Sequence, residues 1–95
     1  MFARVIRTEM GDSQTDPGKF IRENVVPRAK EQKGLKKAYW LIDSENRRGL
    51  NVAIFESLED IQASQKSLTE LQRTAGERTG VRFSPSETYE LVAEI

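Results

Sequence analysis

The sequence contains no cysteine and no histidine among its 95 residues. The absence of cysteine excludes disulfides, thiolate metal sites and thiol nucleophiles. The absence of histidine removes the commonest metal ligand and the side chain that titrates near neutrality. Acidic residues could still bind a metal through oxygen, but their spacing matches no calcium-binding loop. We therefore expect no metal, no haem and no other cofactor.

An excess of either charge is also missing. The 15 basic and 15 acidic residues give a formal net charge of +0, so no global positive field would attract a phosphate backbone. One basic cluster is present, formed by Arg28, Lys30, Lys33, Lys36 and Lys37. Glu31 interrupts this cluster, and no aromatic side chains alternate with it as stacking platforms for bases do. We interpret the cluster as a solvated surface at a helix end and expect no nucleic-acid partner.

Long apolar runs are missing too. The longest one, residues 38–42, is far shorter than the ~18 apolar residues of a membrane-spanning helix. Arg4 and Arg7 interrupt the start of the chain before the apolar region of a signal peptide could form. We therefore expect a cytoplasmic protein with no membrane partner.

The first predicted helix begins at Asp16, because an acidic N-cap followed by Pro17 is typical of a helix start. Apolar residues then recur at four-residue spacing through residues 21–29. Pro27 lies inside this pattern, and we expect it to bend the helix without ending it. Gly34 is the expected left-handed C-terminal cap.

The second predicted helix begins at Ser57, which forms a capping-box pattern with Asp60 three residues later. Its apolar stripe is sparse around Ser64. Either Gly76 or Gly80 is expected to end this helix.

Four segments have the composition of strands. The first is residues 2–8, and residues 35–42 and 50–55 form a hairpin, because the linker 43–49 is short, polar and rich in turn formers. In residues 89–95 the apolar side chains at every second position alternate with Glu90, Val92 and Glu94, and this segment is the last predicted strand.

The resulting order is βαββαβ, the ferredoxin-like arrangement of the α+β class, in which a four-stranded antiparallel sheet carries two helices on one face. The length predicts one domain over residues 1–95. Both sheet faces are apolar, since Trp40 and Tyr39 point to opposite sides, as do Ile54 and Phe55. Because two helices cover one face only, we expect a sheet-to-sheet homodimer to cover the other.

Two segments are similar to a known family. Residues 25–29 place a proline after two aliphatic residues in the first helix, and residues 53–60 place an aromatic, an acidic residue and a serine before the second. On these motifs the chain resembles the dimeric α+β barrel superfamily, and within it the antibiotic biosynthesis monooxygenase-like group. The similarity extends over residues 2–95. It implies a two-fold barrel of facing sheets with a pocket between each sheet and its helices.

The resemblance implies cofactor-free oxygenation of an aromatic or polyketide-like compound. The histidine used by haem-degrading relatives is absent. Oxygenase members carry a polar trio that usually includes an Asn on the first strand, where this chain has Arg4, Arg7 and Thr8. The sequence thus predicts a small-molecule enzyme resembling cofactor-free monooxygenases, with no catalytic residue assigned. The alternative is a non-catalytic dimeric module that binds a ligand or responds to stress.

The candidate ligand-binding residues are Trp40, Tyr39, Asn51 and Arg7. Trp40 and Tyr39 could stack on a small aromatic ligand, or they could pack in the core or the dimer interface. Asn51 interrupts an apolar strand, where Asn is depleted, so it has either a hydrogen-bonding role or an exposed edge position. Arg7 could hold an anionic or phenolate substrate, or it could form an ion pair between subunits.

The alternatives for Arg7 also apply to Arg4, with Glu90 and Glu94 as the expected partners of an ion pair. Tyr89 could donate a phenolic proton, but its place in the apolar alternation favours core packing.

Overall fold

The computed structural model describes residues 1–11 and 16–95. The elements follow in the order β1 (Phe2–Glu9), α1 (Pro17–Phe20), η1 (Ile21–Val25), α2 (Val26–Ala29), β2 (Leu35–Asp43), β3 (Arg48–Phe55), α3 (Leu58–Ala63), α4 (Gln65–Thr79), β4 (Arg82–Phe83) and β5 (Glu87–Glu90). No described helix combines the length and the apolar character needed to cross a membrane.

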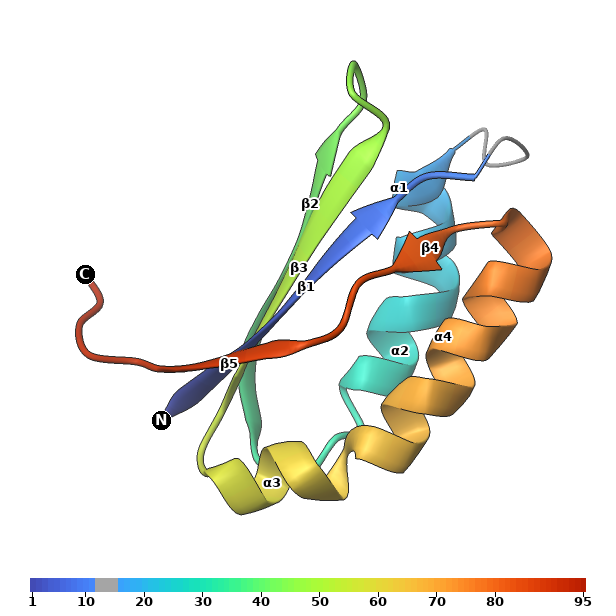
Figure 1. Cartoon of the computed structure of the whole chain (residues 1–95). Coiled ribbons are helices and arrows are strands. Elements are labelled where there is room, and N and C mark those ends of the chain that lie inside the picture. Colours follow the sequence, from blue (N-terminus) through green and yellow to red (C-terminus); the bar gives the residue numbers. More distant parts are fainter. Residues whose placement is uncertain (12–15) are drawn as a thin grey trace.

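The strands form one antiparallel sheet in the order β2–β3–β1, and both β4 and β5 pair with the other edge of β1. The helices lie on one face of this sheet, with α2 and α4 side by side (Figure 1). The ferredoxin-like α+β fold predicted from the sequence is therefore confirmed. Its buried apolar side chains lie between sheet and helices, and the largest, Phe55, is 0% exposed.

The fourth strand position is divided in two, so the sheet has five strands and not the four predicted. β4 pairs with Thr8 and Glu9, whereas β5 pairs with residues 2–5. Between them Ser84 donates its backbone N–H to the Arg7 carbonyl (2.9 Å). Pro85 follows and has no N–H for the ladder.

The predicted strand to residue 95 is wrong beyond Glu90. Residues 91–95 leave the sheet after the Leu91 N–H donates to the Met1 carbonyl (2.9 Å). The C-terminal segment then extends away from the body of the chain (Figure 1). The apolar residues of this segment therefore have no neighbouring strand in the same chain.

Helical geometry continues through Pro27 to Ala29, as predicted. The π-helical turn η1 lies directly before this proline, and the Val26 N–H donates to the Ile21 carbonyl five residues back. The longer hydrogen-bonded turn accommodates the backbone at the point where Pro27 offers no donor. Gly34 takes a φ of 79° after the last turn, in agreement with the predicted left-handed cap.

The second predicted helix is two helices, α3 and α4, which meet at Ser64. The predicted cap is present, since the Asp60 N–H donates to Ser57 Oγ (3.2 Å) and Ser57 Oγ donates to Asp60 Oδ2 (3.0 Å). Ser64 is buried, and its hydroxyl donates to the Ile61 carbonyl (2.7 Å). Gly80, with a φ of 76°, ends α4, and Gly76 lies within it.

The predicted hairpin is present, with Asp43 and Arg48 as its last pair. Asp43 accepts hydrogen bonds from the Asn46 N–H (3.3 Å) and side chain (2.9 Å) and from Arg48 Nε (2.9 Å). The hydrogen bonds from Asn46 and Arg48 lower the pKa of Asp43 below its ordinary value. The carboxylate therefore closes the turn, and the resulting register places Trp40 opposite Asn51.

Replacement by alanine should have opposite effects on stability at Gly34, which follows a helix, and at Gly76, which lies inside α4. Gly34→Ala should lower the free energy of unfolding by about 1–3 kcal/mol, because a side chain at positive φ is strained and its Cβ would collide with the Asp60 carboxylate. Gly76→Ala is the matched control, since its Cβ would meet only the Val81 carbonyl at 3.5 Å. This control should raise stability by about 0.5–1 kcal/mol. Urea denaturation measures both, and equal effects would contradict the assigned backbone geometry.

Candidate functional site

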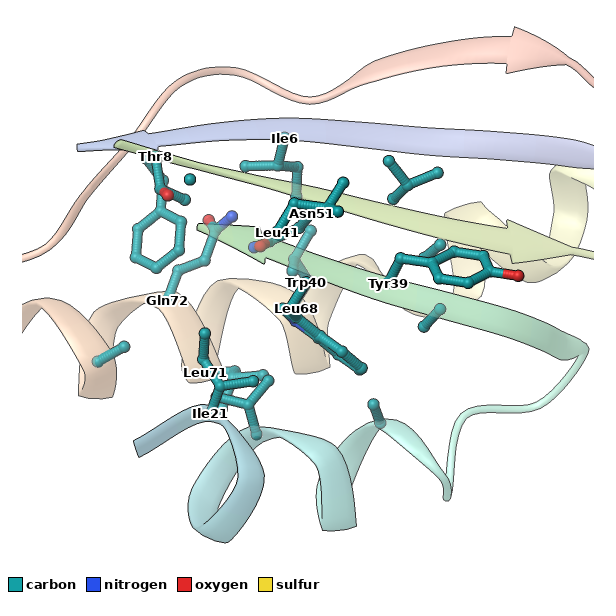
Figure 2. A pocket seen from close by; sticks show the side chains of 18 of the residues that line it. Ile6, Thr8, Ile21, Tyr39, Trp40, Leu41, Asn51, Leu68, Leu71 and Gln72 are labelled. Carbon is teal, nitrogen blue, oxygen red and sulfur yellow. The ribbon is translucent and has the colours of Figure 1, made fainter. Parts of the chain in front are cut away.

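A cavity of about 110 Å³ lies between the helix-facing side of the sheet and the helices (Figure 2). The position of this cavity follows from the strand pairing, because side chains at paired positions form rows across β1, β3 and β2. One row is Arg4, Ala53 and Ala38, and the next is Ile6, Asn51 and Trp40. Ala53 and Ala38 both line the cavity, and their small side chains leave space above this part of the sheet.

The opposite wall consists mainly of apolar side chains of the helices. They are Phe20, Ile21, Val25, Ala29, Leu68, Leu71 and Ala75. Such a lining favours an apolar ligand, with orientation left to the few polar groups of the cavity.

Three uncharged polar side chains, Thr8, Asn51 and Gln72, line this cavity in addition to Gln32, whose amide donates to Ser67 Oγ (3.3 Å). Gln72 extends from α4 toward the sheet, where Thr8 and Asn51 lie (Figure 2). Within the described residues none of the three side chains makes a hydrogen bond. Partly buried amides usually have partners, so these groups are available to a ligand or to water.

Trp40 points from β2 toward the first helix and forms part of the cavity wall (Figure 2). Trp40 is only partly buried in the single chain. The reason is that β2 is an edge strand of the sheet. The structure therefore brings Trp40 and Asn51 together, side by side on adjacent strands.

Tyr39 borders the cavity but belongs to the other face of β2. Its side chain is 50% exposed, and its hydroxyl points away from Asn51 and Gln72 (Figure 2). Tyr39 therefore does not join the polar groups inside.

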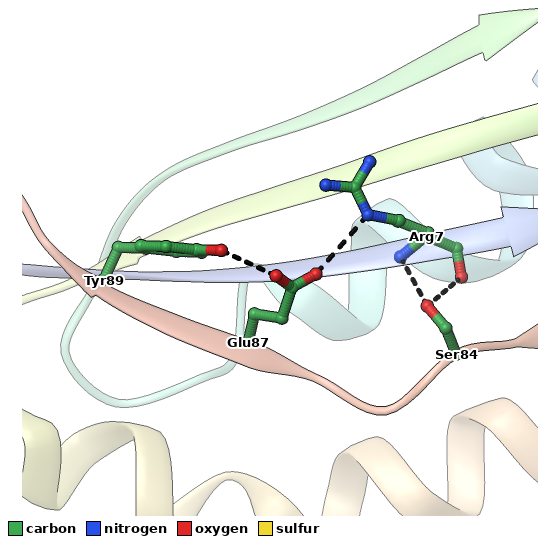
Figure 3. A network of polar contacts seen from close by, with 4 residues as sticks. All are labelled: Arg7, Ser84, Glu87 and Tyr89. Atoms are coloured by element: carbon green, nitrogen blue, oxygen red, sulfur yellow. Dashed lines mark hydrogen bonds and ion pairs between the residues drawn. The ribbon is translucent and has the colours of Figure 1, made fainter.

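Arg7, one of the predicted ligand-binding residues, does not line this cavity. It lies three residues from Arg4 on the same strand, and side chains alternate between faces with period 2. Its Nε forms an exposed ion pair with Glu87 Oε2 (3.4 Å) in the same chain, instead of with the expected Glu90 or Glu94 (Figure 3). Arg7 therefore belongs to the sheet face that the helices leave open, here called the outer face.

Tyr89 was expected to pack in the core. In this chain it lies instead on the outer face and is 52% exposed. Its hydroxyl donates to Glu87 Oε1 (2.6 Å) (Figure 3). This hydrogen bond and the negative charge of Glu87 raise the pKa of Tyr89.

Arg4 is the arginine that faces the cavity, and it is 8% exposed. Its Nη1 donates to Ser64 Oγ (2.6 Å), and its guanidinium lies 5.1 Å from the centre of the Phe55 ring. Burial lowers the pKa of Arg4 below its ordinary value, but an arginine stays protonated in a protein. Side chains in a strand alternate between its two faces, so Arg4 and Arg7, three residues apart in β1, point to opposite faces. This alternation was the available sequence signal that only one of the two arginines faces the helices.

Gln72 is the site residue that sequence reasoning missed. It lies four residues after Leu68 and three before Ala75, so it occupies a position of the apolar stripe of α4. A polar residue at such a position was the available signal. Among the described residues, the cavity is lined by no aspartate, glutamate or lysine, and no group of three acidic side chains could hold a metal ion.

The fold and the cavity together define a ferredoxin-like α+β domain with a pocket between its sheet and its helices. HapK from Hahella chejuensis has a similar structure, with a TM-score of 0.73 and 14% sequence identity over 99% of this chain and 95% of HapK. A dimeric ferredoxin-like protein from an uncultured marine organism gives a TM-score of 0.66 and 16% identity over 100% of this chain and 98% of that protein. At these identities the similarity establishes the fold alone. No model of a protein family and no curated protein matches the chain.

Removal of an unpartnered amide should not destabilise the fold. We expect Asn51→Leu to leave the free energy of unfolding unchanged or to raise it by up to about 1 kcal/mol, because no hydrogen bond within the described residues is lost. Ser64→Ala is the contrasting variant, since it removes the acceptor of buried Arg4 and should cost about 1–3 kcal/mol. Chemical denaturation of both variants checks this, and a large loss for Asn51→Leu would show that its side chain is structural.

Proposed function

We propose that the chain binds a small, flat and largely apolar molecule in the cavity between its sheet and its helices. The observation that carries this proposal is the set of three polar side chains, Thr8, Asn51 and Gln72, which line an apolar cavity without hydrogen bonds within the described residues. An apolar wall supplies affinity, and a few convergent polar groups supply orientation. Trp40 offers an aromatic surface beside them.

A finer proposal is cofactor-free oxygenation of an electron-rich aromatic, the activity implied by the resemblance to monooxygenase-like proteins. In such a reaction an anthrone-type methylene becomes a carbonyl. One oxygen atom of O2 enters that carbonyl, and the other leaves as water with the two hydrogens of the methylene. Since no aspartate, glutamate or lysine of the described residues lines the cavity, the protein would contribute orientation and exclusion of water to a substrate that is already reactive.

A substitution that fills the cavity should show whether the cavity binds a ligand or has only a structural role. Ala53→Leu adds a branched side chain to the sheet row next to Arg4, and we expect it to weaken binding of quinol- and anthrone-type aromatics by more than about tenfold. Ala63→Leu is the matched control, because Ala63 is exposed on α3. Quenching of Trp40 fluorescence, the signal of the single tryptophan, measures binding.

Oxygen uptake with the same compounds then tests the finer proposal. Uptake by the wild-type protein that Ala53→Leu abolishes would support oxygenation. Binding without oxygen uptake would indicate a ligand-binding module without oxygenase activity. Equal binding by Ala53→Leu and Ala63→Leu would contradict the cavity as the binding site.

We further propose that the outer face of the sheet meets the same face of a second copy. Three half-exposed apolar or aromatic side chains lie there, Tyr39, Leu41 and Tyr89, together with aliphatic side chains of β3. A contiguous patch of this kind is unusual on a monomer. One of the two structures similar to this chain is described as dimeric.

The C-terminal segment supports the same interface. Val92 and Ile95 are highly exposed in the single chain, and Glu94 Oε2 lies 3.6 Å from Lys37 Nζ of β2. Lys37 belongs to the outer face through its pairing with Ile54. The segment thus places apolar side chains beside the face that we propose to be buried.

A charge on the outer face should dissociate the dimer. We expect wild-type protein to sediment at twice the mass of the chain at micromolar concentration, and Leu41→Lys to sediment as a monomer. Leu58→Lys is the control, since Leu58 is also exposed (40%, against 52% for Leu41) but lies on α3. A wild-type monomer, or loss of the dimer in both variants, would contradict an interface on this face.

A further inference from the structure

Arg4 is a buried cation with no acidic partner in the described part of the chain. Its side chain is directed to the helix side of the sheet, lines the cavity and is 8% exposed. Among the residues that the structure describes, only Nη1 has a hydrogen-bond acceptor, the neutral Ser64 hydroxyl, and the buried Nε has none. A guanidinium has five N–H donors, so most of its hydrogen-bonding capacity is unused.

The chain does not lack acidic side chains, but they lie elsewhere. The five ion pairs among the described residues all involve exposed side chains, including the one between Arg7 and Glu87. The Phe55 ring gives Arg4 a favourable cation–π contact, but it carries no negative charge. Burial of a charge without a counter-charge is strongly unfavourable. Arg4 is therefore placed to receive an anion that enters the cavity.

The geometry points to an aromatic carboxylate as the ligand of the cavity, with its carboxylate on Arg4. This inference rests on the proposed binding function and names its ligand class. Planar guanidinium groups bind carboxylates through paired charge-assisted hydrogen bonds. Ala53 and Ala38 continue the row of Arg4 across the sheet, and their small side chains leave room beside the guanidinium for the first atoms of a ring.

The next row of the sheet fixes where the rest of the ligand lies. Asn51 lies two residues before Ala53, and Trp40 lies two residues after Ala38; because the strands are antiparallel, both are displaced in the same direction, by ~7 Å. This matches the long dimension of a para-substituted benzoate. With its carboxylate on Arg4, such a ring lies beside Trp40 and directs a para-hydroxyl toward the amides of Asn51 and Gln72. The two ends of the cavity thus select a charge and a hydrogen-bonding group.

The matched probes are 4-hydroxybenzoate and 4-hydroxybenzamide, which have nearly the same shape and differ in charge. We expect the wild-type protein to bind the carboxylate at least ~10-fold more tightly than the amide, as a charge-assisted hydrogen bond would require. Arg4→Met should remove this preference and leave binding of the amide unchanged. Arg7→Met is the control, because Arg7 lies on the outer face, and it should keep the preference. Calorimetric titration of each protein with each probe measures these affinities.

Stability provides the second measurement. Arg4→Met should unfold at the same or a higher denaturant concentration than wild type, since it replaces an unpaired buried charge with an apolar side chain of similar length. If Arg4→Met fails to fold or is strongly destabilised, Arg4 is structural and the inference is wrong. Arg4→Lys then gives an independent test, because it keeps the charge and should retain part of the preference for the carboxylate.

The outcomes separate this inference from the proposed function. Equal binding of both probes by wild type would overturn the role of Arg4 but leave the cavity as a binding site. Failure of both probes to bind would overturn the inference as well, whereas the proposed function would still be decided by the Ala53→Leu comparison with neutral aromatics. Loss of the preference in Arg7→Met would place the anion on the outer face and contradict the assignment.

Discussion

The pairing of β1 with β3 is the interaction on which the other features of the molecule depend. Its register sets Arg4 opposite Ala53 and Ile6 opposite Asn51, and this decides which side chains share the cavity. A shift by one residue would exchange the two faces of β1. Arg7 would then point to the helices and Arg4 to the outer face, so the ion pair with Glu87 and the contact with Ser64 would both be lost. The register therefore determines the core, the cavity and the outer face together.

The cavity places polar groups where an interior optimised for stability would have apolar ones. Asn51 and Gln72 occupy positions that face the helices but make no hydrogen bonds within the described residues, and Arg4 holds a charge there with one neutral acceptor. Native folds usually depart from good packing and polar satisfaction at functional sites. The concentration of three such departures in one cavity is a stronger argument for binding than the volume of the cavity.

The fold could be predicted from the sequence because caps, turn formers and apolar periodicity are local signals that agree with one another. Asp16, Ser57 and Gly34 all have the predicted structural roles. The site could be predicted only in part. Trp40 and Asn51 meet because the turn closed by Asp43 sets the hairpin register, and turn composition alone does not fix that register. At the break between α3 and α4, Ser64 accepts a hydrogen bond from a residue 60 positions away, and no local sequence pattern contains such a contact.

Both edges of the sheet carry features that hinder the addition of further strands. A regular edge strand offers free N–H and C=O groups on which further chains can stack without limit. Here one edge is divided between β4 and β5 around Pro85, and the other carries Lys36, Lys37 and an irregularity in pairing between residues 35 and 37. Both features hinder growth of the sheet by addition of strands. The proposed contact between outer faces is thereby favoured over open-ended fibres, because it closes after two copies.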